Sequence, residues 1–371
     1  MKNPPDVLKA LADARPAQLD APSTPPLPFA LTGRPAPVRR SRRLRAATLI
    51  PAGALAAAAV AGVAVLTLVA IKPGDPAPVP DAAEVARPLT ASQILLAAAE
   101  RSSRETSGTG KYLVVRTESA SVITVGSGAS AYEMTQKSSY ESWLSRSGKQ
   151  RNWLVFQDLG MTPTTPADAA AWRAAGSPKQ VMVGKPLPNG ELGPGSPVSI
   201  AAGPRRSGPS EPADLYAIGV RNVSVRDLEK LPVDPAALRA ELLQQFDGGG
   251  GDLPVDRDEW LLTVASGLIT EIPVSGAVRS AAFRLIATLP GVRSLGDVTD
   301  QRGRPGQGFA YPTQGGTIER RFMIDVASGR ALGEETRVLR SEGRTARREP
   351  GSLLGWSVVL EQKITDETPP K

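Results

Sequence analysis

The stretch from Ala46 to Ile71 holds 26 consecutive residues without a charged side chain. Its most uniformly apolar part, Ala52–Ile71, consists of eight Leu, Ile or Val residues, nine Ala, two Gly and one Thr. About 20 apolar residues, rising about 1.5 Å each in a helix, cross the roughly 30 Å hydrocarbon core of a bilayer. We therefore expect one transmembrane helix over residues 46–71, which divides the chain into two parts.

The charges on either side of this stretch predict its orientation. Lys72 follows it and is soon offset by Asp75, Asp81 and Glu84. Because basic residues concentrate on the cytoplasmic side of membrane spans, the N-terminus is expected in the cytoplasm and everything after Pro73 outside. The predicted location is the cell membrane, crossed once. Five arginines carry this prediction: Arg39, Arg40, Arg42, Arg43 and Arg45.

Three other interpretations fit the same stretch less well. A cleaved signal peptide has an apolar core of roughly 7–15 residues, shorter than this one. Ser41–Ala47 resembles part of a twin-arginine export signal but lacks the full consensus. A buried, alanine-rich helix of a soluble protein is the third alternative. The length of the stretch and its arginine flank favour an uncleaved anchor.

The basic character of the chain is confined to the arm before the span. Residues 1–45 contain nine Lys or Arg and three Asp or Glu, whereas the remaining 326 contain 35 and 34. A nucleic-acid-binding domain needs a basic face on a folded module, and this short, proline-rich arm holds none. We therefore expect no nucleic-acid partner. Residues 1–45 are expected to form a basic, partly disordered arm in the cytoplasm.

The chain of 371 residues contains no cysteine and no histidine. These absences exclude disulfides, thiolate nucleophiles, Ser-His-Asp and Cys-His hydrolases and the usual zinc hydrolases. Carboxylate chemistry, Ser–Lys chemistry and metal sites built from oxygen ligands remain open. We expect no cofactor and assign no catalytic, cofactor-binding or metal-binding residue.

The part after the span reads as a linker, one exterior region and a short tail. Residues 72–90 form a spacer rich in proline and alanine, residues 91–364 the exterior α+β region, and residues 365–371 the tail. Whether the exterior region is one domain or two stays open at this stage. The only plausible division lies at residues 184–213, which are dense in Gly and Pro and predict a long irregular excursion.

The exterior region alternates strand-like and helical blocks. β-Branched and aromatic residues with partial alternation predict an antiparallel meander over residues 110–158. Capping residues and apolar residues at helical spacing predict helices, and strands return after residue 290. The expected N-caps are Thr90 or Ser92, Thr165 and Asp234, and the helical spacing is clearest at Val278, Ala282, Leu285 and Leu289. The segregation of strands from helices favours an α+β domain. We expect an antiparallel sheet with helices on one face, and one transmembrane helix before this domain. The predicted helices cover residues 90–103, 165–176, 231–246, 257–270 and 273–289.

Four segments carry a resemblance to a known group of proteins. They are "GKYLVVRTES" from Gly110, "LPVDPAALRAEL" from Leu231, "AAFRLIATLPGVRSLGDVTDQRGRPGQGFAY" from Ala281 and "RFMIDVASGRALGEETRVL" from Arg321. Together they resemble an uncharacterised family of actinobacterial single-span membrane proteins with an extracytoplasmic α+β domain. The resemblance implies location and fold, but no catalytic residues. More remotely, the element order is similar to the half-barrels of lipoprotein carriers and of periplasmic sensors that bind anti-sigma factors.

Few residues suggest chemistry. Asp297, Asp300 and Asp325 are candidates for a carboxylate pair across strands, but turn-forming or solvated aspartates fit the pattern better. Trp143 and Trp153 are expected on neighbouring strands, either in the core or flooring a ligand groove. The glycine-rich stretch Gly303–Gly308 lies between strands and predicts a hairpin turn instead of a phosphate loop.

The sequence favours a membrane-anchored cell-envelope protein. Its exterior domain is expected to bind a ligand or a protein without catalysis, and its expected partners are the bilayer through residues 46–71 and an envelope protein or an apolar ligand. One alternative is a transmembrane regulator coupled to a sigma factor through residues 1–45. The other is a carboxylate-dependent hydrolase.

Overall fold

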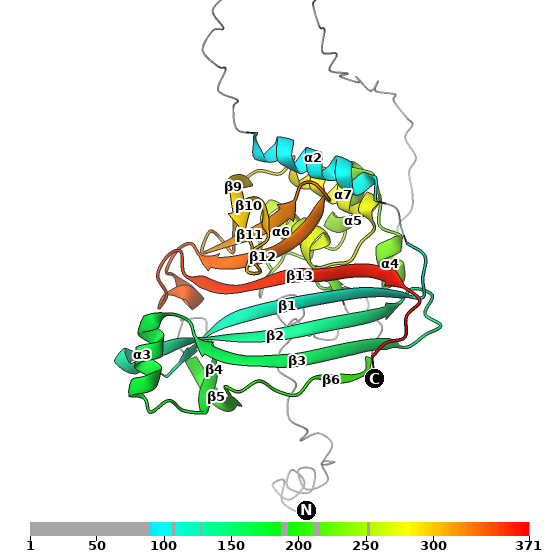
Figure 1. Cartoon of the computed structure of the whole chain (residues 1–371). Helices are drawn as coiled ribbons and strands as arrows, with labels where there is room; N and C mark the ends of the chain where they lie inside the picture. Colours follow the sequence, from blue (N-terminus) through cyan, green and yellow to red (C-terminus); the bar gives the residue numbers. More distant parts are fainter. Residues whose placement is uncertain are drawn as a thin grey trace, which may run out of the picture. The chain divides into compact units, whose positions relative to one another are not determined.

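The computed structural model describes residues 89–105, 108–126, 128–186, 192–210, 216–250 and 253–370 (Figure 1). The predicted cytoplasmic arm, the predicted span and nearly all of the linker lie outside these residues. Among the residues described, no helix is long and apolar enough to cross a membrane. The residues from Leu89 onward belong to one compact unit.

An antiparallel sheet of eleven strands dominates the fold, in the order β6-β3-β2-β1-β13-β12-β11-β10-β9, with β4 pairing both β1 and β5. The predicted α+β class, with a large antiparallel sheet and helices, is confirmed. The strands are β1 (Tyr112–Val125), β2 (Tyr132–Ser145), β3 (Asn152–Pro163), β4 (Gln180–Pro186), β5 (Leu192–Ser199), β6 (Arg206–Ser210), β9 (Arg293–Thr299), β10 (Pro305–Thr313), β11 (Ile318–Asp325), β12 (Arg330–Val338) and β13 (Leu353–Thr365).

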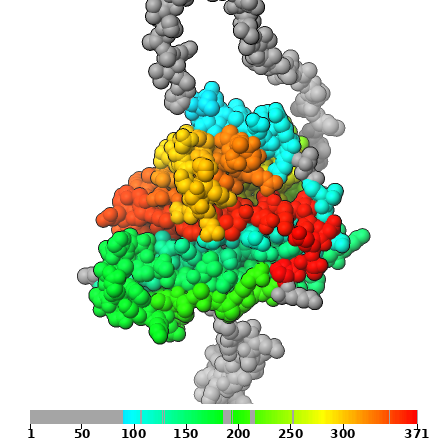
Figure 2. All heavy atoms as spheres, viewed as in Figure 1, coloured from blue at the N-terminus to red at the C-terminus, as the bar shows by residue number. Residues whose placement is uncertain are grey.

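The last strand joins the two strand-rich blocks of the chain. β13 pairs with β1 on one side and with β12 on the other. In Figure 2 the red atoms of β13 form a band between the green β1–β3 region and the orange and yellow β9–β12 region. The strands before and after the helical block therefore form one continuous sheet.

The helices begin at side chains that accept hydrogen bonds from the first turn. Thr90, Thr165 and Asp256 are N-caps, and Asp234 caps a helix whose first residue is Pro235, as the sequence predicts. The helices are α2 (Ala91–Ser103), α3 (Pro166–Ala174), α4 (Val225–Glu229), α5 (Pro235–Leu243), α6 (Arg257–Thr270) and α7 (Gly276–Ile286), and a separate hairpin consists of β7 (Tyr216–Ile218) and β8 (Arg221–Val223).

The largest core lies between helices α2 and α4–α7 and the β10–β11 part of the sheet. Phe309 and Phe322, opposite one another on these strands, stack with ring centroids 5.0 Å apart. Leu95 of α2, Leu238 of α5 and Trp260 of α6 are fully buried in the same core. Helix α2 lies along α7 at the top of this layer (Figure 1). The apolar faces predicted for residues 90–103, 231–246 and 273–289 are therefore the faces that pack.

The prediction of an irregular excursion over residues 184–213 is wrong. Strands β5 and β6 and the end of β4 lie there. Among the described strands, β6 pairs only with β3 and β5 only with β4, so both are edge strands there. Because proline and glycine are tolerated in edge strands, Pro197 and Pro209 fit these positions although they hide the strand pattern in the sequence. The first strand of the predicted meander is long, because β1 runs without a break from Tyr112 to Val125.

Two adjacent leucines of α2 test the packing of the helical layer. Leu95 has no exposed surface, whereas Leu96 is 42% exposed. Leu95→Ala should lower the free energy of unfolding by about 2–5 kcal/mol, because it leaves a cavity in the core. Leu96→Ala should change it by less than about 0.5 kcal/mol. Urea unfolding of the two variants measures both values, and equal effects would contradict the packing of α2.

Candidate functional site

The three aspartates considered as catalytic candidates have separate hydrogen-bond partners. The buried Asp300 carboxylate accepts hydrogen bonds from the backbone nitrogens of Arg302 and Arg304 and pairs with the Arg304 side chain at 2.7 Å. Asp325 accepts from the Ser328 hydroxyl at 2.7 Å within the β11–β12 turn. Asp297 accepts from Gln307 on the neighbouring strand. Each carboxylate thus has a local structural partner.

Trp143 and Trp153 lie directly opposite one another on β2 and β3, so their predicted placement on neighbouring strands is confirmed. The Trp143 indole is buried and donates to Glu141 at 2.8 Å. The Trp153 indole donates to the Ser207 hydroxyl at 2.6 Å, and that hydroxyl donates to the backbone oxygen of Pro370 at 2.5 Å. The C-terminal tail is therefore tied to this tryptophan pair.

A buried polar cluster lies between the end of α6 and strands β11 and β12. One Arg320 guanidinium nitrogen donates to both oxygens of Glu334, at 2.9 and 3.0 Å. The Thr270 hydroxyl contacts the same carboxylate at 3.4 Å, and Glu271, the residue after α6, shares a hydrogen bond with it. The Tyr311 hydroxyl lies beside Ser266 of α6. We call Glu271, Arg320 and Glu334 the α6 charge cluster.

The two glutamates of the α6 charge cluster differ in proton affinity. Burial raises the pKa of Glu271 well above the ordinary glutamate value, and the neighbouring Glu334 carboxylate raises it further. Burial by itself would also raise the pKa of Glu334, but the charge of Arg320 and several hydrogen bonds lower it overall. Glu271 is thus the proton donor to an ionised Glu334.

One sequence signal pointed toward this cluster. Arg320 alternates with Ile318, Phe322 and Ile324 along β11, so it is the one charged residue on the side of that strand facing the core. An arginine in such a position needs a buried counter-charge. The sequence does not say which of the many acidic residues supplies it, because Glu271 and Glu334 are distant in the chain.

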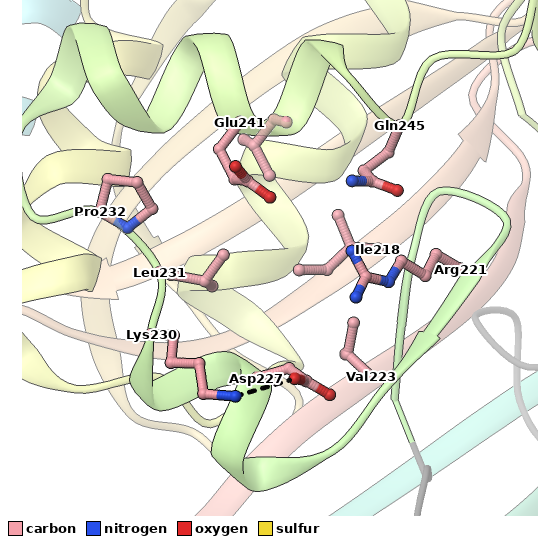
Figure 3. Close-up of a pocket in the computed structure, with 10 residues that line it drawn as sticks. Ile218, Arg221, Val223, Asp227, Lys230, Leu231, Pro232, Glu241 and Gln245 are labelled. Atoms are coloured by element: carbon pink, nitrogen blue, oxygen red, sulfur yellow. Dashed lines mark ion pairs between the residues drawn. The ribbon is translucent and has the colours of Figure 1, made fainter. Parts of the chain in front are cut away.

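A pocket of about 270 Å³ opens between the β7–β8 hairpin, α4 and α5 (Figure 3). Its floor consists of the buried aliphatic side chains of Ile218, Val223 and Leu242. We call it the α4–α5 pocket. The remaining lining residues are Arg221, Asp227, Lys230, Leu231, Pro232, Glu241 and Gln245.

The charged side chains of this pocket fall into two groups. Asp227 pairs with Lys230 at 3.7 Å and accepts from Ser224, whose hydrogen bonds lower the pKa of Asp227. By contrast, among the described residues neither Arg221 nor Glu241 makes a side-chain hydrogen bond or ion pair. Figure 3 shows both side chains directed toward the space between the elements. These two opposite charges are available to a ligand.

A second, larger opening of about 500 Å³ lies at the β2–β3 turn. Several of its polar groups are held by hydrogen bonds within the fold. The Arg226 guanidinium donates to the backbone oxygen of Ser147, and the Asn152 amide oxygen accepts from the Ser145 backbone at 2.8 Å. The α4–α5 pocket is therefore the stronger candidate for recognition.

No protein-family model matches this chain, and no curated protein matches it.

The proton on Glu271 makes the stability of the fold depend on pH. The folded chain binds this proton more tightly than the unfolded chain does. The stabilisation of the fold by the proton is therefore fully present below the ordinary glutamate pKa and is lost as the pH rises through the raised pKa of Glu271. Glu271→Gln should remove this alkaline loss. Urea unfolding between pH 4 and pH 9 measures it.

The exposed Glu349 provides the control for this measurement. Glu349→Gln should leave the pH profile of the unfolding free energy like that of the native chain. Glu334→Gln deprives Arg320 of its main counter-charge and should destabilise the fold by about 3 kcal/mol at neutral pH. A Glu271→Gln profile that fell with pH as steeply as the native one would contradict the assigned proton.

Proposed function

We propose that this chain is a single-span protein of the cell envelope whose exterior domain binds a small charged ligand without transforming it. In this proposal residues 46–71 cross the membrane, residues 1–45 lie in the cytoplasm and residues 91–364 lie outside. The charge distribution of the sequence supports the orientation, since the net charge is +6 over residues 1–45 and +1 over the rest.

The α4–α5 pocket is the observation that carries the binding part of the proposal. Folded proteins normally pair or solvate their charges, and a concave site with an apolar floor and a few convergent polar groups is the usual form of a ligand site. The exposed Arg221 and the half-buried Glu241 face such a site, and neither side chain has a partner among the described residues. An apolar ligand would leave both charges unused, so the pocket favours a charged one.

The resemblance to the actinobacterial single-span family supports the same architecture. It rests mainly on residues 231–340, which include α5, α6, α7 and strands β9–β12. The similarity to half-barrel carriers and sensors is one of fold alone and adds no ligand. A protein partner in the envelope is compatible with the anchored arrangement, but the pocket favours a small molecule over a protein as the ligand.

One observation favours a carboxylate-dependent hydrolase as a second candidate. The α6 charge cluster provides a protonated and an ionised carboxylate in contact, the pairing that acid–base catalysis uses. Glu334, however, is only 7% exposed and is held by Arg320 and Thr270. These contacts favour a structural role for the pair. The sigma-factor alternative depends on residues 1–45, which lie outside the described residues.

A fragment screen on the full chain in lipid nanodiscs tests the binding proposal. Small charged fragments should bind, as ligand-observed NMR detects, and Leu231→Trp should abolish their binding because the indole fills the α4–α5 pocket. Leu339→Trp adds the same indole at a position that is 39% exposed and outside the pocket, and should leave binding intact. No fragment sensitive to Leu231→Trp would mean that this pocket is not a ligand site.

A further inference from the structure

We infer that the α4–α5 pocket binds a small zwitterion with an aliphatic body, of the kind represented by a free aliphatic α-amino acid. This inference rests on the proposed binding function and narrows it to a ligand class. It is argued from three properties of the pocket: the placement of its free charges, the chemistry of its floor and its size.

The two free charges belong to different walls. Arg221 begins β8, and Glu241 lies on α5. They form no ion pair with each other, although both line the same pocket. A guanidinium binds a carboxylate through two parallel hydrogen bonds, and a glutamate accepts from an ammonium group. A ligand carrying one carboxylate and one ammonium would satisfy both walls at once.

The second pair of charged residues that lines the pocket, Asp227 and Lys230, adds no net charge to it. Asp227 and Lys230 neutralise each other, and Asp227 is further held by Ser224. Arg221 helps to keep the pKa of Asp227 low through space, but donates no hydrogen bond to it. The free charge of the pocket is therefore one positive and one negative group, which matches a ligand without net charge.

The floor and the volume define the rest of the ligand. Ile218, Val223 and Leu242 are buried aliphatic side chains, and none of the described residues that line the pocket is aromatic. About 270 Å³ is below the roughly 300–1,000 Å³ typical of sites for drug-sized molecules, so the ligand is about the size of an amino acid. Gln245, two residues after the end of α5, adds a neutral donor and acceptor.

Three probes separate the contributions of the two charges. Leucine carries both, 4-methylpentanoate carries only the carboxylate, and 3-methylbutylamine carries only the ammonium. Calorimetric titration of the full chain in lipid nanodiscs should give an affinity for leucine at least tenfold higher than for either single-charge probe. Because one end of a peptide carries only one of these charges, the same probes distinguish a free amino acid from a peptide terminus.

Substitutions assign each charge to its wall. Arg221→Gln should lower the affinity for leucine at least tenfold and leave the affinity for 3-methylbutylamine unchanged. Glu241→Gln should lower the affinity for leucine at least tenfold without lowering the affinity for 4-methylpentanoate. The matched control is Arg239→Gln, since Arg239 lies on the same helix but pairs with Asp258 outside the pocket. This control should bind leucine like the native chain.

The outcomes separate this inference from the proposed function. If a single-charge probe binds as tightly as leucine, or if leucine does not bind while fragments sensitive to Leu231→Trp do, the zwitterion inference is overturned and the binding function stands. If no fragment is sensitive to Leu231→Trp, the proposed site itself fails. Leucine binding that is lost in both Arg221→Gln and Glu241→Gln supports the inference.

Discussion

Helix α6 is the element on which the arrangement of the helical layer depends. Ten of its 14 residues are buried, so it needs partners on nearly every side. Its Trp260 packs edge-on against Phe246, which follows α5, at 5.4 Å between ring centroids. The turn of the β7–β8 hairpin lies close above the same indole: a Cβ at Gly219 would stand 2.6 Å from it, and the φ of +61° at this position also favours glycine. Through these contacts α6 sets the spacing of two walls of the α4–α5 pocket.

The end of α6 is fixed to the sheet by a different kind of contact. The α6 charge cluster joins the residue after the helix to β11 and β12 through a shared proton and an arginine. Replacing a buried ion pair with apolar side chains often changes stability little, whereas removing one partner is costly. The cluster is therefore expected to contribute more to the position of α6 on the sheet than to net stability. It lies apart from the pocket, since none of its three residues lines it.

Local features of the fold were readable in the sequence, and distant pairings were not. Caps such as Thr90 and Asp234 act on the next three residues, and the buried spacing of Val278, Ala282 and Leu285 repeats within one helix, so both predictions were confirmed. The pairing of β13 with β1 joins residues about 240 positions apart and follows from no local pattern. The edge strands β5 and β6 were missed because their glycines and prolines are typical of loops. The pocket was missed because Arg221 and Glu241 line one site only after the β7–β8 hairpin packs beside α5, and no local pattern predicts that packing.

The central proposal is that this domain lies outside the membrane, on an anchor whose basic arm faces the cytoplasm. Because the chain has no cysteine, a single introduced cysteine gives an unambiguous label. The informative positions are Val255, which is 71% exposed, and Ser23 in the arm. With a membrane-impermeant maleimide, Val255→Cys should be labelled on intact cells and Ser23→Cys only after the cells are permeabilised. Labelling of Ser23→Cys on intact cells, or protection of Val255→Cys until permeabilisation, would contradict the account.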